Sequence, residues 1–450
     1  MKKTIIFLCI ALALGAYVYF YEIKGGEERE KAKEESEKLF SLEKDSIQSV
    51  LIQSFAGHYL LNRTNDGWQI EIPVKTKADE STVNSLLYGI TSAKKTRTFN
   101  IKAKDKYDYG VGPGGIKLTV TSKSGIRDSV FLGQSSAVGS EIYASKTDTI
   151  IHLISSSLKS NADKTLFEWR DKRPLLFQKD EVREITLVNP AGRYTIVKEN
   201  NEWKISSPVE TKAEKSKVDD ILNKLYSGRI KAVVSETPDK SGQYRLINPG
   251  YRVELSIGPD KTKTGVSFSS LKDNQAYGRD DVRPHIFEVD SAFMKPLKAD
   301  LYELRYKKVL EFNKDQVDHF NLLYKNQLLT FNKDTTDNWY LAGGEKAKSW
   351  KVTGILRKLN DLKVDRFVQE KPVYFMNFGL VNPEGKVEIF IGQNRVAELN
   401  IGYTQGDEVF IYNPQMKPLM AIKASNLEEL FPKKSDLVEE VKETIAEDAE

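Results

Sequence analysis

The sequence predicts an α+β protein made of three tandem repeats of a mainly antiparallel β unit, each with one packed amphipathic helix, after an N-terminal transmembrane helix. Three tryptophans predict the repeat: Trp68, Trp203 and Trp339 stand 135 and 136 residues apart, each after a polar turn (TNDG, ENNE, TTDN). A helical pattern and then a strand-like run follow each one. Solenoid repeats have periods of about 20 to 50 residues, so this longer period indicates tandem domains.

Each repeat has one helix pattern. Four apolar residues recur at i, i+3, i+4 and i+7, a spacing that places them on one helix face. They are Val83, Leu86, Leu87 and Ile90, then Val218, Ile221, Leu222 and Leu225, then Val352, Ile355, Leu356 and Leu359. We expect each tryptophan to pack against this face in the core rather than to bind a ligand.

Short strands surround each predicted helix. In the first repeat, residues 47–55, 59–63 and 68–72 predict a three-stranded meander that ends at Pro73. After the helix comes an aromatic-to-proline element (YDYGVGPGG, YRLINPG, NFGLVNPEG) and a further strand (IKLTV, RVELSIG, KVEIFIG). Turns rather than crossover helices join the strands, which favours antiparallel pairing.

The repeat supplies the domain boundaries. The predicted segments are 1–21, a cytoplasmic tip and transmembrane signal anchor; 22–38, a charged stalk; 39–172, 173–309 and 310–432, the repeats; and 433–450, an acidic tail. Each repeat is long enough to bury its own core. The tail is predicted to be a frayed amphipathic helix or disordered.

The N-terminal segment predicts a membrane anchor. Lys2 and Lys3 precede an uncharged, mainly apolar run over residues 4–21, which as a helix would cross roughly 27 Å, about one bilayer core. A cleaved signal peptide is the alternative. No A-x-A-like site closes the run, and Glu22 follows it, so an uncleaved anchor is favoured. The two lysines place the amino terminus inside and the bulk of the chain outside.

The stalk after this anchor predicts a short solvated helix, with a flexible spacer as the alternative. Glu27 with Lys31 and Glu34 with Lys38 are spaced as i, i+4 ion pairs in the favourable order.

Composition argues against several classes of function. With 68 basic and 64 acidic residues, the formal charge is +4 over 450 residues, and the two signs are interleaved, which does not predict a nucleic-acid-binding protein. The single cysteine, Cys9, excludes an internal disulfide and a thiolate-rich metal site. An exterior part without cysteine is compatible with a bacterial periplasm.

Two motifs resemble parts of enzyme sites. The glycine-rich run 109–115 looks like a phosphate loop, but a strand follows it instead of a Lys-Ser/Thr helix, so a hairpin turn is predicted. Ser156 to Lys159 and Ser269 to Lys272 match S-x-x-K, and 263–265 matches K-T-G of penicillin-recognising enzymes. The S-D-N element is missing and the pieces lie in different repeats, which disfavours this enzyme class.

The remaining polar candidates also favour structural roles. No H-x-x-x-H spacing joins the histidines, which are predicted to be half-buried or at the surface: His58, His152, His285 and His319. His285 and Glu288 fall in a predicted strand, where i and i+3 face opposite sides. Asp280 and Asp281, beside Arg279 and Arg283, predict a solvated charge cluster rather than an acid–base pair. No catalytic, cofactor-binding or metal-binding residue is predicted.

The anchor, the tryptophan strand, the helix and an aromatic-Gly-Leu-x-x-Pro element together resemble the bacterial family catalogued as domain of unknown function 4340. The element is clearest at Phe378, Gly379, Leu380 and Pro383. The glycine-centred pieces FLGQS at Phe131, SIGPD at Ser256 and FIGQN at Phe390 fit as well. The sequence departs at Tyr244-Arg245-Leu246, which has no glycine, and at Gly110-Val111, where the first repeat is one residue short.

The resemblance covers residues 39–432 and brings no catalytic residues with it. It implies a protein anchored in the bacterial inner (cytoplasmic) membrane and an accessory role beside a gliding-motility-type ABC transporter. We therefore expect a non-enzymatic extracytoplasmic scaffold that binds a transporter or another envelope complex, without cofactor or nucleic acid. The alternatives are an envelope glycan-binding module, which would need exposed aromatics, and an envelope enzyme of the penicillin-recognising type.

Overall fold

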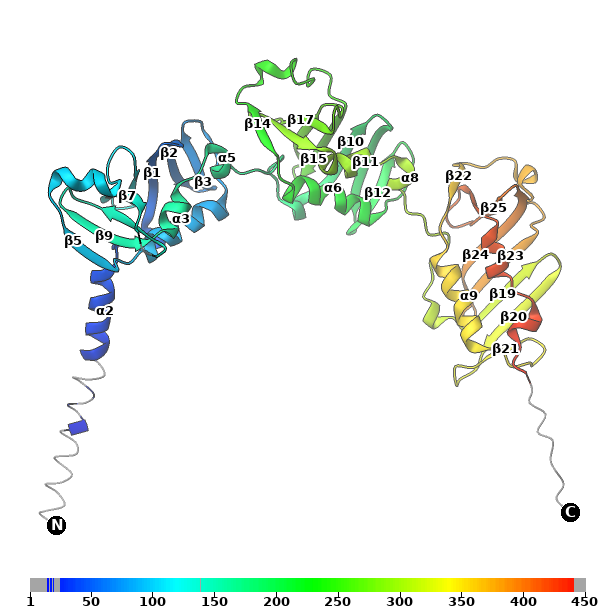
Figure 1. The fold of residues 1–450 in the computed structure, drawn as a ribbon. Coiled ribbons are helices and arrows are strands. Elements are labelled where there is room, and N and C mark those ends of the chain that lie inside the picture. Colours follow the sequence, from blue (N-terminus) through cyan, green and yellow to red (C-terminus); the bar gives the residue numbers. More distant parts are fainter. Residues whose placement is uncertain (1–13, 16, 18, 20–24, 138, 441–450) are drawn as a thin grey trace, which may run out of the picture. The chain divides into compact units, whose positions relative to one another are not determined.

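The computed structural model describes residues 14, 15, 17, 19, 25–137 and 139–440. It contains three antiparallel sheets of nine, nine and eight strands, one in each predicted repeat (Figure 1). By the density of internal contacts the chain divides into two units. One comprises Met1–Pro174, Gly228–Lys240 and Val282–Val289, and the other comprises Leu175–Ser227, Ser241–Asp281 and Asp290–Glu450.

The first sheet has the strand order β4-β3-β2-β1-β6-β7-β8-β9-β5. Its strands are β1 (Ile47–Ser54), β2 (Gly57–Thr64), β3 (Gly67–Ile72), β4 (Thr76–Lys77), β5 (Arg97–Asn100), β6 (Ile116–Ser122), β7 (Arg127–Ser135), β8 (Glu141–Ser145) and β9 (Ile150–Ser155). The helices are α3 (Glu80–Ser92), α4 (Ser157–Ala162) and α5 (Leu166–Trp169), with 3₁₀ turns η2 (Lys44–Ser46) and η3 (Ala103–Tyr109).

The second sheet repeats that order as β13-β12-β11-β10-β15-β16-β17-β18-β14. Its strands are β10 (Val182–Asn189), β11 (Gly192–Glu199), β12 (Glu202–Ser207), β13 (Thr211–Lys212), β14 (Ala232–Ser235), β15 (Tyr251–Ile257), β16 (Thr262–Phe268), β17 (Gln275–Asp280) and β18 (Ile286–Asp290). The helices are α6 (Lys215–Ser227), α7 (Ser291–Met294) and α8 (Leu301–Leu304), with η4 (Lys179–Glu181), η5 (Pro238–Ser241) and η6 (Lys295–Lys298).

The third sheet has the order β21-β20-β19-β23-β24-β25-β26-β22. Its strands are β19 (His319–Tyr324), β20 (Gln327–Lys333), β21 (Trp339–Leu341), β22 (Arg366–Gln369), β23 (Gly385–Ile391), β24 (Asn394–Gln405), β25 (Glu408–Tyr412) and β26 (Leu419–Lys423). The helices are α9 (Ser349–Asp361), α10 (Ser425–Leu430) and α11 (Lys434–Leu437), with η7 (Lys314–Gln316) and η8 (Phe375–Phe378).

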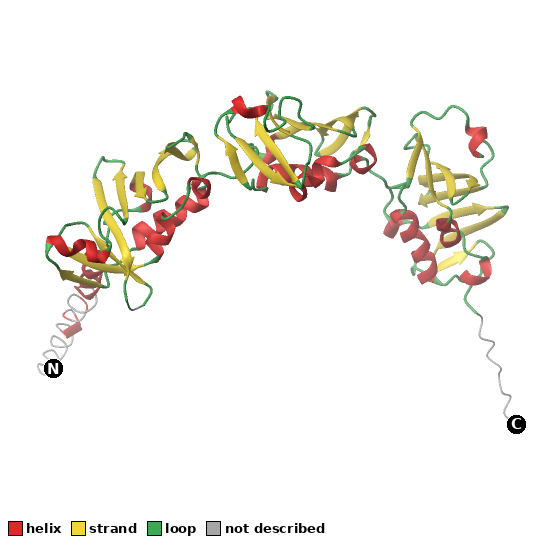
Figure 2. Ribbon diagram, turned by 45° about the horizontal axis from the view of Figure 1, so that its top comes forward, coloured by secondary structure: helices red, strands yellow, loops and turns green. Residues whose placement is uncertain are grey.

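The predicted amphipathic helices are α3, α6 and α9, and each packs on its sheet (Figure 2). The four apolar residues of the predicted pattern are buried in each of these helices. In α6 and α9 no other residue is buried. Each helix follows a strand at one edge of its sheet and precedes the strand at the opposite edge. It therefore carries the chain across the sheet while its apolar face covers the core.

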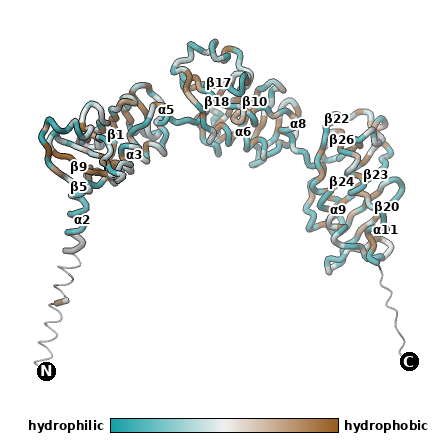
Figure 3. The backbone as a smooth tube through the Cα atoms, in the orientation of Figure 1, coloured by the Kyte–Doolittle hydropathy of each residue, from teal (hydrophilic) through white to brown (hydrophobic). Residues whose placement is uncertain are grey.

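The repeated tryptophans are buried, as predicted: Trp68, Trp203 and Trp339 are 2%, 6% and 3% exposed. Trp68 shares one hydrophobic core with Leu87, and Trp339 shares another with Leu356. Hydrophobic residues occur in short stretches between hydrophilic ones along the sheets, as expected for strands with one face in a core (Figure 3).

The strand order confirms the predicted meander and corrects one motif. β1, β2 and β3 pair antiparallel in sequence order. Gly258 and Gly392 follow the equivalent strands β15 and β23, whereas Gly133 of FLGQS lies within β7, one strand later. Gly125, which has φ +84° after β6, occupies the position of Gly258 and Gly392. FLGQS is thus a local likeness in a different strand.

The stalk is helical, as predicted, over α2 (Gly25–Glu37). The predicted pair of Glu34 with Lys38 is wrong. Lys38 bonds Glu35 instead, and Glu34 accepts from Lys94 of the first repeat at 3.1 Å. Both acids lie within reach of a lysine on or near the repeat, which outweighs the regular i, i+4 geometry. The predicted pair of Glu27 with Lys31 lies outside the described side chains.

Part of the predicted acidic tail belongs to the third core. Leu437 is fully buried there, and Val438 forms a backbone bridge with Ala347. The short helix α11 fits the helical alternative predicted for the tail, but it is packed rather than frayed, because Leu437 lies in the third core. Residues 441–450 lie outside the described part.

Most of the predicted transmembrane run, residues 4–21, also lies outside the described residues. Among the residues that are described, no helix is long and apolar enough to cross a membrane.

Candidate functional site: an exposed loop on the third repeat

A long loop connects the outermost strand of each sheet to the central one. We call these segments the edge loops: residues 101–115, 236–250 and 370–384. They contain η3, η5 and η8 and lie at equivalent places in the three sheets. The aromatic-to-proline elements of the sequence form the second half of each edge loop.

One aromatic ring anchors each edge loop to its own sheet. The ring centroids of Tyr109 and Tyr143 are 4.9 Å apart, and those of Tyr244 and Tyr277 are 4.8 Å apart. Phe378 packs edge-on against Phe410 at 5.0 Å. Face-to-edge contacts of this kind add to the burial of the rings.

The residue after each anchor is left-handed, with φ of +68° at Gly110, +59° at Arg245 and +68° at Gly379. Glycine takes this conformation without steric cost, whereas arginine does not. Arg245 therefore adopts the same left-handed turn as the two glycines, although it is not a glycine. A side chain at Gly379 would also meet the ring of Tyr403, 2.4 Å from the position of a Cβ atom.

The third edge loop exposes an unusual amount of apolar surface. Val373, Tyr374, Met376 and Val381 are 71%, 70%, 73% and 58% exposed. In the short 3₁₀ helix η8, residues three apart eclipse each other, so Phe375 and Phe378 both turn inward. Phe375 contacts Tyr412 at 4.8 Å. The loop is held by its inward rings and presents the other apolar side chains to solvent.

The other two edge loops are more polar. Tyr107 in the first is 60% exposed and Ile247 in the second is 72% exposed.

A cavity of about 200 Å³ lies under the first edge loop. Its lining includes Tyr107, Phe131, Lys106, Lys146 and Asp148. Lys106 there pairs with Asp148 at 2.5 Å.

The residues of the S-x-x-K and K-T-G matches have partners within the fold. Lys159, on α4, donates from Nζ to the Gly133 carbonyl at 2.8 Å. Ser269 is fully buried, and its Oγ accepts from the Tyr277 N–H at 3.0 Å. Lys263, on β16, pairs with Glu254 at 2.8 Å. The glycine-rich run forms the end of the first edge loop and leads into β6, as the predicted turn requires.

The charge cluster predicted around Asp280 is only half correct. Asp281 is paired with Arg252, through contacts of 2.8 and 3.0 Å, at a partly exposed position. Asp280 is buried, with 4% exposed. Arg283 donates to the backbone carbonyls of Arg173 and Pro174, at 2.9 Å each. The alternation of strand β17 turns Asp280 inward, a direction that neighbouring charges in the sequence did not reveal.

The histidines are spread among separate environments. His58 is exposed, His152 bonds Thr98 at 2.9 Å, and His319 bonds Asn332 at 2.7 Å. His285 is only 2% exposed, against the prediction of a half-buried or surface residue. Burial, with Arg283 and Arg170 nearby, lowers the pKa of His285 to about 3. Within residues 25–137 and 139–440, no group of three His, Cys, Asp or Glu side chains could hold a metal ion.

The apolar surface of the third edge loop is not predicted by the sequence. Its signal is a comparison across repeats: KPVYFMNFGLV stands where the first two repeats carry mostly polar or glycine-rich sequence. The stretch resembles core sequence in isolation, and only the fold shows which of its side chains face solvent.

Comparison with known proteins places the chain in a family. A search for similar curated proteins gave no match. A putative DNA polymerase III beta subunit from Eubacterium rectale is 7% identical, over 85% of this chain and 92% of that one, with a TM-score of 0.16, which does not indicate a shared fold. The model of the family described as "Domain of unknown function (DUF4340)" matches residues 68–204, 203–368 and 339–446, three segments that each start at one of the repeated tryptophans. The chain therefore belongs to the DUF4340 family and contains three consecutive matches to its model.

Proposed function

We propose that this chain is a single-pass, membrane-anchored extracytoplasmic scaffold that holds a protein partner through its third edge loop. The observation that carries the proposal is the exposed apolar group of Val373, Tyr374, Met376 and Val381 on an anchored loop. Contiguous exposed apolar surface costs solubility, and it usually marks a site where another molecule binds. Aromatic and methionine side chains are also enriched in protein–protein interfaces.

The membrane anchor and the class of partner rest on the sequence. The apolar run over residues 4–21 supports an anchor in the bacterial inner membrane. The partner proposed from family resemblance is an ABC-type, gliding-motility-like transporter or another envelope complex. The scaffold role requires no catalysis, and a fluorescent penicillin should leave the purified chain unlabelled.

Capture from native membranes tests the partner site. Tagged full-length protein is crosslinked in cells, solubilised in detergent, purified and analysed by mass spectrometry. The double variant Tyr374→Ser/Met376→Ser should lose a membrane-protein partner that the wild type retains. Ile247→Ser removes a similarly exposed side chain from the second edge loop and is the matched control. Equal recovery of every partner by the double variant would rule out this loop as the binding surface.

Protease accessibility tests the topology independently. Protease added to spheroplasts should degrade residues 39–432, and protease added to inside-out vesicles should not. Protection of this region in spheroplasts would contradict the extracytoplasmic location.

A glycan-binding module is the second candidate, favoured by the cavity beneath the first edge loop. Tyr107 and Phe131 offer ring faces, and Lys106, Lys146 and Asp148 offer polar contacts. Soluble cell-wall fragments should bind the wild type and not Tyr107→Ala if this candidate is correct, as measured by calorimetry. Identical heats for the two proteins would remove it.

A further inference from the structure

An ion pair of the same kind occurs at both transitions from one repeat to the next. Arg170 follows α5, and its Nη2 donates to both carboxylate oxygens of Glu236 at 2.8 and 2.9 Å. Arg305 follows α8, 135 residues later, and its Nη1 and Nη2 donate to Glu370 at 2.5 and 3.1 Å. Glu236 and Glu370 both come directly after the edge strand, β14 or β22, of the following repeat. We call each pair an Arg–Glu clasp.

Each clasp buries its arginine and leaves its glutamate partly exposed. The side chains of Arg170 and Arg305 are 1% and 3% exposed, whereas their glutamates are 42% and 38% exposed. The Arg305 guanidinium also lies 3.5 Å from the ring centroid of Phe367. A buried arginine without its acid is strongly destabilising, although an intact buried pair adds little net stability over apolar residues of similar size. The glutamate is therefore needed once the arginine is there.

Matching backbone hydrogen bonds surround both clasps. The N–H groups of Asp79 and Asp171 donate to the carbonyls of Trp169 and Lys77, at 2.7 and 2.9 Å, and Ile230 donates to Lys172 at 2.9 Å. The equivalent bonds at the second clasp are Glu214 to Leu304, Tyr306 to Lys212 and Val364 to Lys307, at 2.8, 3.0 and 2.8 Å.

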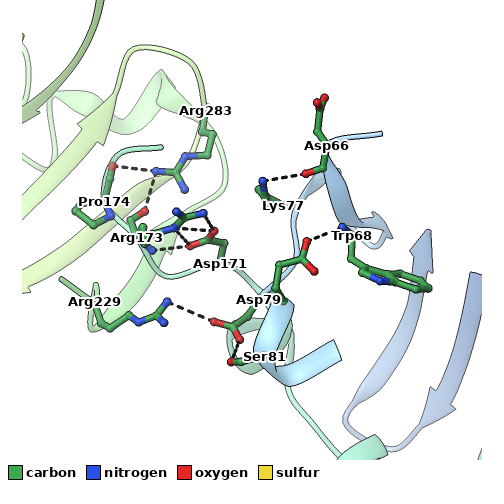
Figure 4. Close-up of polar contacts among 11 residues, drawn as sticks. Asp66, Trp68, Lys77, Asp79, Ser81, Asp171, Arg173, Pro174, Arg229 and Arg283 are labelled. Atoms are coloured by element: carbon green, nitrogen blue, oxygen red, sulfur yellow. Dashed lines mark hydrogen bonds and ion pairs between the residues drawn. The ribbon is translucent and has the colours of Figure 1, made fainter. Parts of the chain in front are cut away.

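Side-chain contacts reinforce the first transition. Arg229 reaches Asp79 at 3.3 Å, beside the pair of Arg173 with Asp171 (Figure 4). Arg229 and Asp79 thus join the two repeats directly, in addition to the backbone bonds of Asp171 and Lys172.

The first and third repeats each carry only one half of the clasp. Ile101 follows β5 in the first repeat, at the position of Glu236 and Glu370. Val438 pairs with Ala347 as Arg170 pairs with Ala78 and Arg305 with Ala213, so it occupies the arginine position of the third repeat. Among the three repeats, the arginine is thus found in the first and second and the glutamate in the second and third, the positions that meet at the two transitions.

We propose that the Arg–Glu clasp is a recognition element through which each repeat selects the next repeat of this chain and fixes the register in which it docks. A buried ion pair suits that role because apolar packing tolerates many registers, whereas an unpaired buried arginine excludes all but the one that supplies its acid. The partner that this surface fits is another repeat with a glutamate after its edge strand.

A double-mutant cycle on the full chain tests the proposal, with Arg170→Met, Glu236→Met and the two combined. Glu236→Met leaves Arg170 buried and unpaired, so it should lower the melting temperature of the affected part by about 10 °C. The combined variant should melt within about 2 °C of the wild type, since methionines can fill the same space. Trypsin should nevertheless cut after Lys172 about ten times faster in the combined variant, because the linking segment opens more often without the clasp.

The surface pair of Lys204 with Glu199, 2.8 Å apart and half exposed, is the matched control. Its double methionine variant should change neither the melting temperature nor the cleavage rate. Arg305→Met/Glu370→Met repeats the experiment at the second clasp, should the first set fold poorly. Wild-type cleavage rates in the combined variants would overturn the recognition role, and so would a combined variant that melts as low as Glu236→Met.

Discussion

Single buried side chains account for much of the stability of each repeat. The tryptophans are equivalent in sequence and in burial, so each should cost about the same to remove. Another tryptophan, Trp350 on α9, is 72% exposed and provides a direct contrast. Burial rather than residue type therefore decides what a tryptophan contributes here.

Trp203→Ala should lower the free energy of unfolding of its repeat by about 3 to 5 kcal/mol, because it removes apolar contacts and leaves a cavity. Trp350→Ala should change it by no more than about 0.5 kcal/mol. Urea unfolding followed by circular dichroism measures both. A small effect at Trp203 with lost partner capture would mean that the tryptophan is a binding residue and not a core residue.

His285 should make stability depend on pH. Its folded pKa of about 3 lies below the ordinary value of 6.5, so the folded state keeps it neutral while the unfolded state takes up a proton. Its contribution is complete above pH 6.5 and is lost as the pH falls toward 3, by about 1.4 kcal/mol per pH unit.

Between pH 7 and pH 5, the wild type should therefore lose about 2 kcal/mol more unfolding free energy than His285→Gln. His58→Gln, at an exposed position, should follow the wild type. Urea titrations at the two pH values decide the matter, and parallel curves for wild type and His285→Gln would show that the histidine is not buried neutral.

Helices α3 and α9 differ at the N-cap residue that precedes them, although their buried faces match. Asp79 caps α3 by accepting from the Thr82 N–H at 2.9 Å. Lys348, at the equivalent position before α9, makes no side-chain cap. The amphipathic pattern specifies where each helix packs, and the cap adjusts its stability independently.

Lys348→Asp should stabilise the third repeat by about 1 kcal/mol, since aspartate can accept from the first-turn N–H groups and favours the positive end of the helix. Lys358→Asp, in the last turn of α9, should give no gain because the charge there opposes the helix dipole and the pair with Glu429 is lost. Thermal unfolding measures both, and a loss of stability in Lys348→Asp would contradict the assignment of the cap.

At the scale of the whole molecule, three equivalent sheets are joined through equivalent clasps, and the edge loops differ most in their exposed residues. The sheets carry what the repeats share, and the loops carry what distinguishes them. A repeat protein of this design can vary its loops while every core stays the same.

A fragment covering residues 173–309 should unfold cooperatively by itself, because it contains all nine strands of the second sheet and helix α6. It should be less stable than the same repeat in the full chain, since it lacks the Lys172 carbonyl that accepts from Ile230. Calorimetry of both proteins gives the comparison. A broad, non-cooperative transition in the fragment would place the domain boundaries elsewhere.

The sequence alone determined the repeat, the three helices and most strands, because periods of 3.6 and 2 are local properties of the chain. It also predicted that the tryptophans are core residues, since each one precedes an amphipathic helix pattern. Residues such as Leu437 and Asp280 were misassigned because burial depends on partners far away in the sequence.

Only the tertiary structure decided the strand order, in which each helix leads from one edge of a sheet to the other. The tertiary structure also shows that Gly133 lies in a different strand from the position of Gly258 and Gly392. It shows that Arg170 pairs with Glu236, 66 residues away. Tyr374 faces solvent, whereas Phe375 packs on Tyr412. Long-range pairing and side-chain direction depend on which surfaces meet in the fold, and no local pattern of residues records that.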